Sequence, residues 1–258
     1  MMKVVILAGG LGTRLSEETA LKPKPMVEIG GKPILWHIMK HYSHYGYNDF
    51  IICCGYKGYM IKEYFANYNL HTSDVTIDLE SNEMITHKKK SEPWKVTLID
   101  TGDDTLTGGR LLRVKKYLGD KTFMLTYGDG LSNVNLDELL EAHRIHNHQV
   151  TITAVKPPLR FGILDIDDGY NVTSFKEKPE GDGKYINGGF MVCEPDIFTY
   201  IDNDKTALEK TPLSQMSEHG KMGAYLHHGF WYAMDTIRDK QHLEELWQQG
   251  NAEWRVWE

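Results

Sequence analysis

A group of glycines and cations near the start of the chain has the residue types of an anion-binding site. Three glycines fall within residues 9–12 of KVVILAGGLGTRL, where backbone N–H groups could approach an anion without an obstructing Cβ. Thr13 adds a hydroxyl, and the guanidinium of Arg14 suits two-point contact with a phosphate. Lys24 lies between two prolines, which stiffen its backbone and fix the place of its charge. This combination predicts a phosphate-binding loop; the alternative is an ordinary strand-to-helix turn with exposed cations.

Two well-known phosphate-binding loops do not fit this stretch. The P-loop pattern GxxxxGK[ST] does not occur in the sequence. The dinucleotide pattern GxGxxG fails because Leu15 stands where the third glycine should be. The next predicted strand runs through Cys54 into Gly55, without the acidic residue that would bind a ribose. A nicotinamide-dependent dehydrogenase is therefore disfavoured.

The composition is that of an ordinary globular protein. The 258 residues are 41% hydrophobic and 25% charged, and the formal net charge of -7 argues against a nucleic-acid partner. The three cysteines form neither a disulfide framework nor a CxxC metal pattern. The apolar run at residues 4–8 is too short for a signal peptide or a membrane span, so we expect a soluble cytoplasmic protein without membrane association.

The elements that would position the glycine loop alternate along the first part of the chain. Continuous apolar runs predict buried strands at 4–7, 49–56, 122–130 and 149–155. Helices are predicted between them at 33–46, 57–65 and 136–146. This alternation predicts an α/β fold with a mixed, mainly parallel, Rossmann-like sheet flanked by helices.

Two other regions look different from this pattern. Residues 74–100 read as short strands with turns, which predicts a β-rich insertion beside the main sheet. Residues 161–179 and 185–195 also read as strands and turns, which predicts a β-rich second half. No repeat, low-complexity tract or linker divides the chain, so residues 1–258 are predicted to form a single domain.

The motifs resemble those of the sugar-1-phosphate nucleotidyltransferases. LAGGLGTRL at 7–15 with KPKPM at 22–26 is similar to the signature of that family. Further similar strings are YGDG, EKP, INGGF and FWYAMDT, at residues 127–130, 177–179, 186–190 and 230–236. The longer strings KPKPMVEIGGKPILWHIMK, IICCGYKGY, DTGDDTLTGGRL and LWQQGNAEWRVWE resemble the branch of the family that makes CDP-glucose.

The resemblance implies a reaction of CTP with α-D-glucose 1-phosphate that gives CDP-glucose and pyrophosphate. A phosphate oxygen of the sugar phosphate would attack the α-phosphorus of the nucleotide in line, with Mg²⁺ as the cofactor. CDP-glucose normally feeds dideoxy-sugar and surface-polysaccharide synthesis, including the O-antigen of lipopolysaccharide. Two alternatives stay open: an enzyme that uses UTP or dTTP with the same sugar phosphate, and a non-catalytic regulator on the same fold. Filled cation and carboxylate positions argue for activity.

The resemblance also implies the central residues of the site. Arg14 and Lys24 would lie beside the triphosphate, and Lys178 beside the sugar phosphate. Asp129 and Asp235 match the metal ligands of the family, and Mg²⁺ is usually held by one or two carboxylates together with phosphate oxygens and water. The alternatives are a plain turn aspartate at Asp129 and a helix N-cap at Asp235. The expected catalytic residues are thus Arg14, Lys24, Asp129 and Asp235.

The remaining contacts are expected on both sides of this centre. The sugar phosphate is expected to contact Glu177, Lys178, Asn187 and Gly188, although NGG is also a common hairpin turn. Arg110 could contact the base or a phosphate, and its alternative is a solvated helix cation. The expected nucleotide-binding residues are Leu7, Ala8, Gly9, Gly10, Leu11, Gly12, Thr13, Arg14, Lys24, Asp104, Thr105, Gly108, Arg110 and Gly128.

The resemblance further implies a homo-oligomer, such as a hexamer. The 74–100 insertion is longer than a nucleotide site needs. We expect it to form a subunit interface or a lid over the base. The substrates CTP and glucose 1-phosphate are the other expected partners, and neither a nucleic acid nor a membrane is expected.

Overall fold

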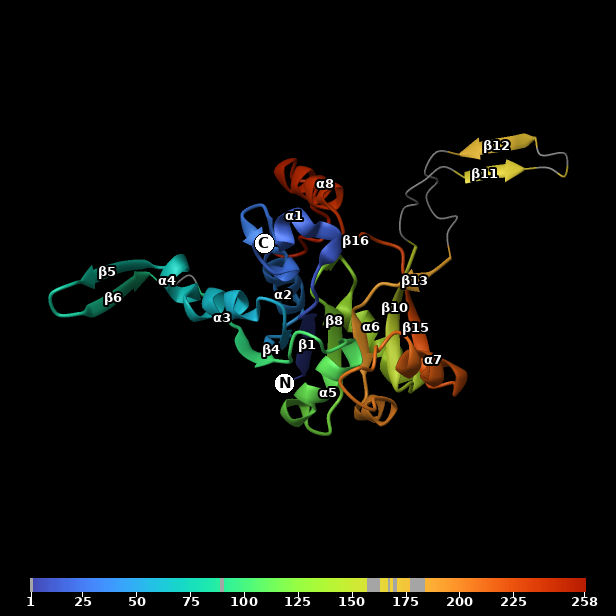
Figure 1. Ribbon diagram of the computed structural model, residues 1–258, viewed down its shortest axis with the longest axis horizontal. Helices are drawn as coiled ribbons and strands as arrows, with labels where there is room; N and C mark the ends of the chain where they lie inside the picture. The colour runs from blue at the N-terminus through green and yellow to red at the C-terminus, as the bar shows by residue number, and fades with distance from the viewer. Residues whose placement is uncertain (1, 89–90, 157–162, 167, 169–170, 177–183) are drawn as a thin grey trace.

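An eight-stranded mixed sheet forms the centre of the computed structural model, which describes residues 2–88, 91–156, 163–166, 168, 171–176 and 184–258 (Figure 1). The strands follow one another in the order β13-β10-β14-β8-β1-β4-β7, and β15 also pairs with β10. Their bounds are β1 (Lys3–Ala8), β4 (Asp49–Cys54), β7 (Lys95–Asp100), β8 (Phe123–Tyr127), β10 (Val150–Val155), β13 (Ile186–Asn187), β14 (Met191–Cys193) and β15 (Met222–His227).

The middle of this sheet is parallel, as the apolar runs predicted. Strand β1 pairs in parallel with β4 on one side and with β8 on the other, and β7 pairs in parallel with β4. Every residue of β4 is buried, because helices cover both faces of the sheet. Strand β14 runs antiparallel to both β8 and β10, which makes the sheet mixed. The fold class predicted from the sequence is confirmed.

Helices cover both faces of the sheet. One core contains residues of α2 (Ile34–His44), α6 (Leu136–His146) and α8 (Ile237–Gln248). The core on the opposite face contains residues of α5 (Thr107–Leu118), η3 (Pro195–Tyr200) and α7 (Thr211–Glu218). Neighbouring strand residues point to opposite faces, so Cys53 and Cys54 belong to different cores.

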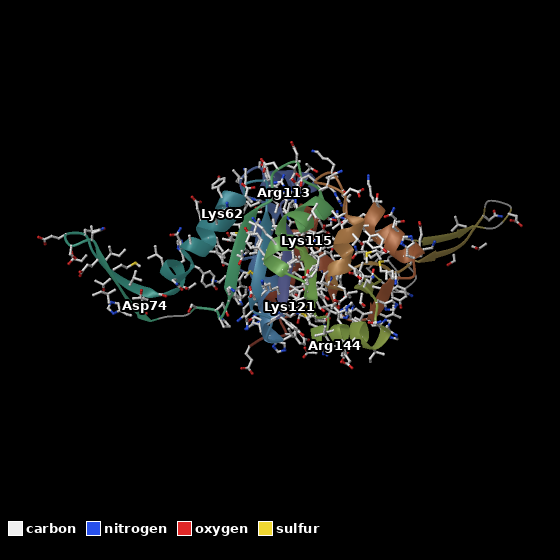
Figure 2. All side chains as sticks on the ribbon, turned by 90° about the horizontal axis from the view of Figure 1, so that it is seen from below. Lys62, Asp74, Arg113, Lys115, Lys121 and Arg144 are labelled. Carbon is white, nitrogen blue, oxygen red and sulfur yellow. The ribbon has the colours of Figure 1, made fainter. Side chains whose placement is uncertain are left out.

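The segment at 74–100 divides into two parts. Strands β5 (Asp74–Asp78) and β6 (Glu83–Lys88) form an antiparallel hairpin that projects away from the main sheet (Figures 1 and 2). Helices α3 (Gly58–Ala66) and α4 (Tyr68–Thr72) lead to it. The last six residues of the segment instead form β7, whose register with β4 places Cys54 opposite Asp100. The part outside the sheet is thus shorter than the sequence suggested.

Short elements complete the chain around the sheet. No helix in the described ranges is long and apolar enough to cross a bilayer. Strands β11 (Ile163–Ile166), β12 (Val172–Lys176), β13 and β14 fall in the two later regions that the sequence predicted to be β-rich. The short elements are η1 (Thr13–Leu15), α1 (Ser16–Thr19), η2 (Lys24–Met26), β2 (Glu28–Ile29), β3 (Lys32–Pro33), β9 (Gly130–Ser132), β11 (Ile163–Ile166), β12 (Val172–Lys176) and β16 (Trp231–Ala233).

Candidate active site

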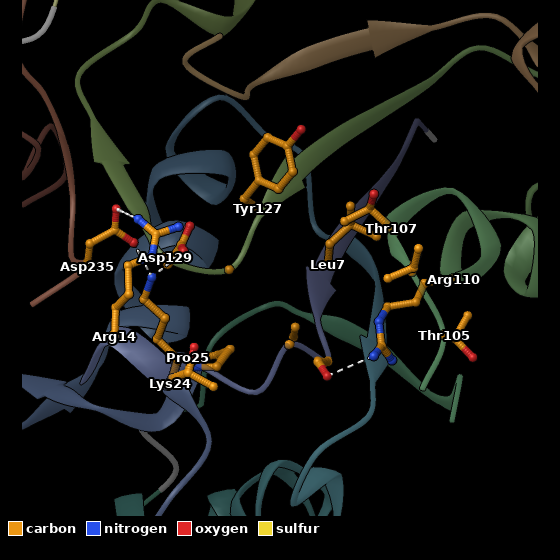
Figure 3. Close-up of a pocket in the computed structure, with 17 residues that line it drawn as sticks. Leu7, Arg14, Lys24, Pro25, Thr105, Thr107, Arg110, Tyr127, Asp129 and Asp235 are labelled. Atoms are coloured by element: carbon orange, nitrogen blue, oxygen red, sulfur yellow. Dashed lines mark hydrogen bonds and ion pairs between the residues drawn. The ribbon is translucent and has the colours of Figure 1, made fainter. Parts of the chain in front are cut away.

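A pocket opens at the carboxyl ends of β1 and β8, where α/β proteins usually bind their ligands (Figure 3). It brings together the glycine loop, the KPKP segment, the start of α5 and both predicted aspartates. Thirteen residues predicted from the sequence line it: Leu7, Ala8, Gly9, Gly10, Gly12, Thr13, Arg14, Lys24, Thr105, Arg110, Gly128, Asp129 and Asp235. The other lining residues are Pro25, Leu106, Thr107 and Tyr127, of which only Thr107 was expected beside the nucleotide.

Lys24 lies between the two aspartates of the pocket. Its Nζ donates to Asp129 Oδ2 at 2.6 Å and to Asp235 Oδ1 at 2.7 Å. The other oxygen of Asp235 accepts from Arg14 Nη1 at 3.0 Å. Lys24 begins the short helix η2, which follows Pro23 and has Pro25 as its second residue, so its backbone is held in one conformation. Two cations and two carboxylates therefore meet at one end of the pocket.

Strand pairing explains why two aspartates so far apart in sequence meet here. Asp129 lies in the turn between β8 and β9, and β9 pairs with β16, which ends just before Asp235. The N–H of Met234 donates to the carbonyl of Asp129 at 3.0 Å, which locks the two segments together. Asp235 is not the N-cap of α8. The capping residue is Thr236, in a reciprocal capping box with Asp239.

The two carboxylates control the charge of Lys24. Burial alone would lower its pKa, but the nearby Asp129 and Asp235 outweigh burial, and the pKa of Lys24 is raised above its ordinary value. The side chain is therefore an ammonium ion at neutral pH. An ammonium can bind anions but has no lone pair with which to act as a nucleophile.

Arg110 has a role that neither sequence interpretation gave it. It is only 4% exposed, so it is not a solvated helix cation. Its Nη2 donates to the carbonyl of Gly9 at 2.9 Å, and its Nη1 donates to Gly102 O at 2.7 Å and Thr101 Oγ1 at 2.8 Å. Longer bonds reach Cys54 O and Asp103 O. One guanidinium thus ties together the segments that follow β1, β4 and β7.

The glycines of the loop serve different purposes. A Cβ on Gly9 would lie 2.2 Å from Arg110 Nη1, so the absence of a side chain at Gly9 makes room for the guanidinium. A Cβ on Gly10 would meet nothing within 4 Å, so its backbone faces open space in the pocket. Gly12 has a φ of 64°, which favours glycine. Packing against Arg110 is a reason for glycine at position 9 that the sequence did not indicate, and the contact of this loop with an anion stays a prediction.

Three residues predicted for nucleotide binding do not line the pocket. Leu11 is 54% exposed, and Asp104 is also exposed. Gly108 faces the segment after η3, because its N–H donates to Thr206 O at 3.0 Å. The N–H of Gly109 also donates to Thr206 O, so two free donors at the start of α5 are already satisfied. Nucleotide contacts at these three positions stay predictions.

The predicted sugar side is described in part. Asn187 and Gly188 lie on or beside β13, near Tyr127: Asn187 Nδ2 donates to Tyr127 Oη at 3.1 Å. Gly188 permits close packing, since a Cβ there would lie 2.9 Å from Val155 Cγ1. Glu177 and Lys178 fall outside the described residues.

The carboxylates of the pocket suit a divalent cation that is also bound by phosphate oxygens of the substrates. Two carboxylates already surround one cation, the Lys24 ammonium, at 2.6 and 2.7 Å. Within the described ranges, no group of three or more His, Cys, Asp or Glu side chains could hold a metal alone. Magnesium sites at phosphate-binding pockets use one or two carboxylates and complete their shell with phosphate oxygens and water.

The geometry defines a class of protein before any comparison. An α/β sheet whose pocket holds an open glycine loop, two cations and two carboxylates has the residues to bind a phosphate-bearing ligand together with a divalent cation. The comparison with known families agrees: residues 3–239 match the Nucleotidyl transferase family. The chain belongs to this family.

The chain resembles known proteins both in sequence and in three-dimensional structure. A glucose-1-phosphate cytidylyltransferase of Salmonella typhi is 59% identical over 258 residues, covering all of both chains. A probable glucose-1-phosphate cytidylyltransferase of Bacillus subtilis is 47% identical over 257 residues, covering 99% of this chain and 100% of that protein. The crystal structure of HddC from Yersinia pseudotuberculosis has a TM-score of 0.70 at 26% identity, covering 96% of this chain and all of that one.

Proposed function

We propose that the protein transfers a cytidylyl group from CTP to α-D-glucose 1-phosphate and releases CDP-glucose and pyrophosphate. The observation that carries this proposal is the 59% identity over the full length to a glucose-1-phosphate cytidylyltransferase. Thirteen of the residues expected from the motifs line one pocket, which supports the same activity.

The chemistry needs charge control more than a protein nucleophile. Glucose 1-phosphate already carries the nucleophilic oxygen, which attacks the α-phosphorus of CTP while pyrophosphate leaves. Two phosphate charges 4 Å apart repel each other by about 4 kcal/mol at an effective dielectric near 20. The Lys24 ammonium and the Arg14 guanidinium reduce this repulsion at the end of the pocket where they meet Asp129 and Asp235.

The loops supply the positioning. The N–H of Gly10 borders the open part of the pocket, where a phosphate can approach. Leu7 and Thr105 lie on the side of the pocket away from Lys24 and Asp235, which suits a nucleoside (Figure 3), and Leu106 also lines the pocket. Asp129 and Asp235 would hold Mg²⁺, which when bound supplies further positive charge to the phosphate oxygens. Holding both substrates in line converts an encounter of two anions into a reaction within one complex.

Pyrophosphate release from each nucleoside triphosphate tests this function. The purified protein is incubated with glucose 1-phosphate, Mg²⁺ and CTP, UTP, dTTP, ATP or GTP in turn. We expect release with CTP to exceed release with the others. Release with UTP or dTTP but not CTP would reassign the base, and no release with any would leave a regulatory protein as the better explanation.

We further propose that residues 1–258 act as one domain in a homo-oligomer, with a hexamer as the expected form. The eight strands of the main sheet come from both halves of the chain, from β1 near its start to β15 near its end, which supports a single domain. The β5–β6 hairpin carries four exposed apolar side chains that would be unusual facing water: Ile77, Leu79, Met84 and Ile85. No described lining residue of the pocket comes from the hairpin, so a subunit contact suits it better than a lid. The substrates are cytoplasmic metabolites, and we propose that location, with surface-polysaccharide synthesis as the pathway served.

A further inference from the structure

Glu209 connects two sides of the pocket although no sequence motif marks it. Its Oε2 accepts from Thr107 Oγ1 at 2.7 Å, and its Oε1 accepts from Tyr127 Oη at 2.8 Å. Thr107 and Tyr127 both line the pocket, whereas Glu209 does not. Thr107 starts α5 beside the nucleoside end, and Tyr127 ends β8 two residues before Asp129 (Figure 3).

The chain of bonds continues from Tyr127 to the predicted sugar side. Tyr127 Oη accepts from Asn187 Nδ2 at 3.1 Å. The other end of the same amide, Asn187 Oδ1, accepts from the N–H of Gly189 at 2.8 Å. Three side chains from separate parts of the sequence, Glu209, Tyr127 and Asn187, therefore form one continuous row of hydrogen bonds, here called the Glu209 row.

The carboxylate fixes the direction of every bond in the Glu209 row. An ionised carboxylate only accepts, so the Tyr127 hydroxyl must donate to it and keeps its lone pairs for another donor. Asn187 then has to present its NH₂ group to Tyr127, and the Gly189 N–H requires the amide oxygen on the other side.

The backbone around Glu209 is itself tied down. Thr206 O accepts from the N–H groups of Gly108 and Gly109, and the N–H of Leu208 donates to Thr107 Oγ1 at 2.9 Å. The Thr107 hydroxyl therefore accepts from Leu208 and donates to Glu209, which uses its single proton. The Glu209 carboxylate thus extends from a backbone segment that hydrogen bonds hold in place.

We infer that Glu209 is a positioning residue that sets the orientation of the Asn187 amide for the sugar phosphate. The inference rests on the proposed function, with glucose 1-phosphate contacting Asn187 as the sequence predicts. With the row intact, one Asn187 N–H and one lone pair of its oxygen remain at fixed positions for a sugar hydroxyl. Glu209 touches no substrate; it acts through Tyr127.

The variant Glu209→Gln tests the direction of the bonds, because it keeps the size of the side chain but makes one oxygen an NH₂ donor. Thr107 and Tyr127 both donate to position 209, so one of them must face this new donor. We expect the KM and the calorimetric Kd for glucose 1-phosphate to rise by about 10-fold or more, the scale of a lost hydrogen bond to a charged group. We expect the KM for CTP to change by a smaller factor. Glu218→Gln, on the exposed end of α7, is the matched control.

Tyr127→Phe removes the hydroxyl that links Glu209 to Asn187, and provides a second variant. If the row acts as one unit, Glu209→Gln adds little to the sugar-phosphate Kd once Tyr127 is Phe. Multiplicative effects of the two changes, or a Glu209→Gln protein with unchanged affinity for glucose 1-phosphate, would overturn the inference. If the wild-type protein turns over CTP and the Glu209→Gln variant has the same affinity for glucose 1-phosphate, only the inference about Glu209 fails. A wild-type protein that neither binds glucose 1-phosphate nor turns over removes the proposed function with it.

Discussion

The ammonium of Lys24 lies 2.6 Å from the carboxylate of Asp129, although 105 residues separate the two in the chain. A second carboxylate, from Asp235, holds the same ammonium at 2.7 Å. Because the two carboxylates hold the Lys24 ammonium between them, a divalent metal ion could bind to the same oxygens. Lys24 and a divalent metal are therefore expected to compete for the same oxygens.

Lys24→Met should change activity and metal affinity in opposite directions. We expect kcat to fall by about 100-fold, as for the loss of one preorganised charge contact. Affinity for Mn²⁺ or Mg²⁺ should rise by about 10-fold, because a unit charge 4 Å from a divalent ion repels it by about 2 kcal/mol even in water. Metal titration by calorimetry measures this, and Lys22→Met, which removes a cation paired with Glu28, is the control. Weaker metal binding in Lys24→Met would contradict the shared position.

Asp129→Asn and Asp235→Asn should each lower kcat by about 100-fold or more. Each change removes one negative charge that holds Lys24 and that would hold the metal. The affinity for Mn²⁺ should fall in both variants, in contrast to Lys24→Met. Asp196→Asn on η3, whose carboxylate accepts from Gln149, serves as the control. Wild-type turnover in either pocket variant would remove that aspartate from the proposed metal site.

Gly9→Ala should destabilise the protein because of Arg110 and not because of a ligand. The added Cβ would lie 2.2 Å from a guanidinium that makes five hydrogen bonds. In an Arg110→Ala background the same change should cost little, which gives a coupling energy of about 1 kcal/mol or more. Denaturant unfolding of the two single variants and the double variant measures this coupling.

Gly10→Ala is the matched control for Gly9→Ala. Its Cβ would have nothing within 4 Å, so the free energy of unfolding should change by less than about 0.5 kcal/mol. The KM for CTP should rise, because the new methyl group stands where the phosphate approaches. Equal destabilisation by the two substitutions would refute the distinction between these glycines.

Two buried histidines should make the fold sensitive to mild acid. Burial lowers the pKa of His37 to about 4 and that of His41 to about 3. As the pH falls, each of these histidines takes up a proton in the unfolded chain, where its pKa is about 6.5, but stays neutral in the folded chain. The free energy of unfolding should therefore drop below pH 6.5 by about 1.4 kcal/mol per pH unit for each histidine, until the folded pKa is reached.

Unfolding by urea at pH 7, 6 and 5 checks this dependence. Replacing His37 by Gln should remove less than half of the slope, because His41 and His227, whose pKa burial also lowers, still contribute. His146→Gln, at an exposed helix end, should leave the slope unchanged. An unaltered slope in the His37 variant would show that other groups cause the acid sensitivity.

Removing the β5–β6 hairpin should change the assembly of the protein. Replacing residues 74–88 by a short Gly-Ser linker deletes four exposed apolar side chains without touching β7 or the pocket. We expect a smaller species by size-exclusion chromatography with light scattering, and a KM for CTP near that of the full chain. An unchanged mass would argue against the hairpin as a subunit contact, and a raised KM would favour a lid.

Local signals in the sequence were enough to predict much of the fold. The helix at 136–146 was found with correct bounds because Asn135 caps its start and Asn147 adopts the left-handed conformation at its end. The strands at β1 and β4 were found because both of their faces are apolar. Strand β7 was missed as part of the sheet, because KVTLID lies at the edge, half-buried, and its pairing with β4 is not a local property.

The sequence indicated pocket residues that stand in motifs more readily than residues that act through others. Lys24 stands between two prolines and Asp129 between two glycines, and Asp235 was marked by the family-like string FWYAMDT. Arg110 was found, but its partners Gly9 and Gly102 come from different loops, so its clamping role needs the three-dimensional structure. Glu209 has no motif at all, and only its bonds to Thr107 and Tyr127 reveal it.

The stereochemistry of transfer tests the central claim most directly, which is that the sugar phosphate attacks the α-phosphorus without a protein nucleophile. The raised pKa of Lys24 keeps it protonated and unable to attack. CTP made chiral at the α-phosphorus with one sulfur atom is converted with glucose 1-phosphate, and the configuration of the product is determined by ³¹P NMR. A single in-line displacement predicts inversion. Retention would mean two displacements through a cytidylyl-enzyme intermediate and would contradict the account.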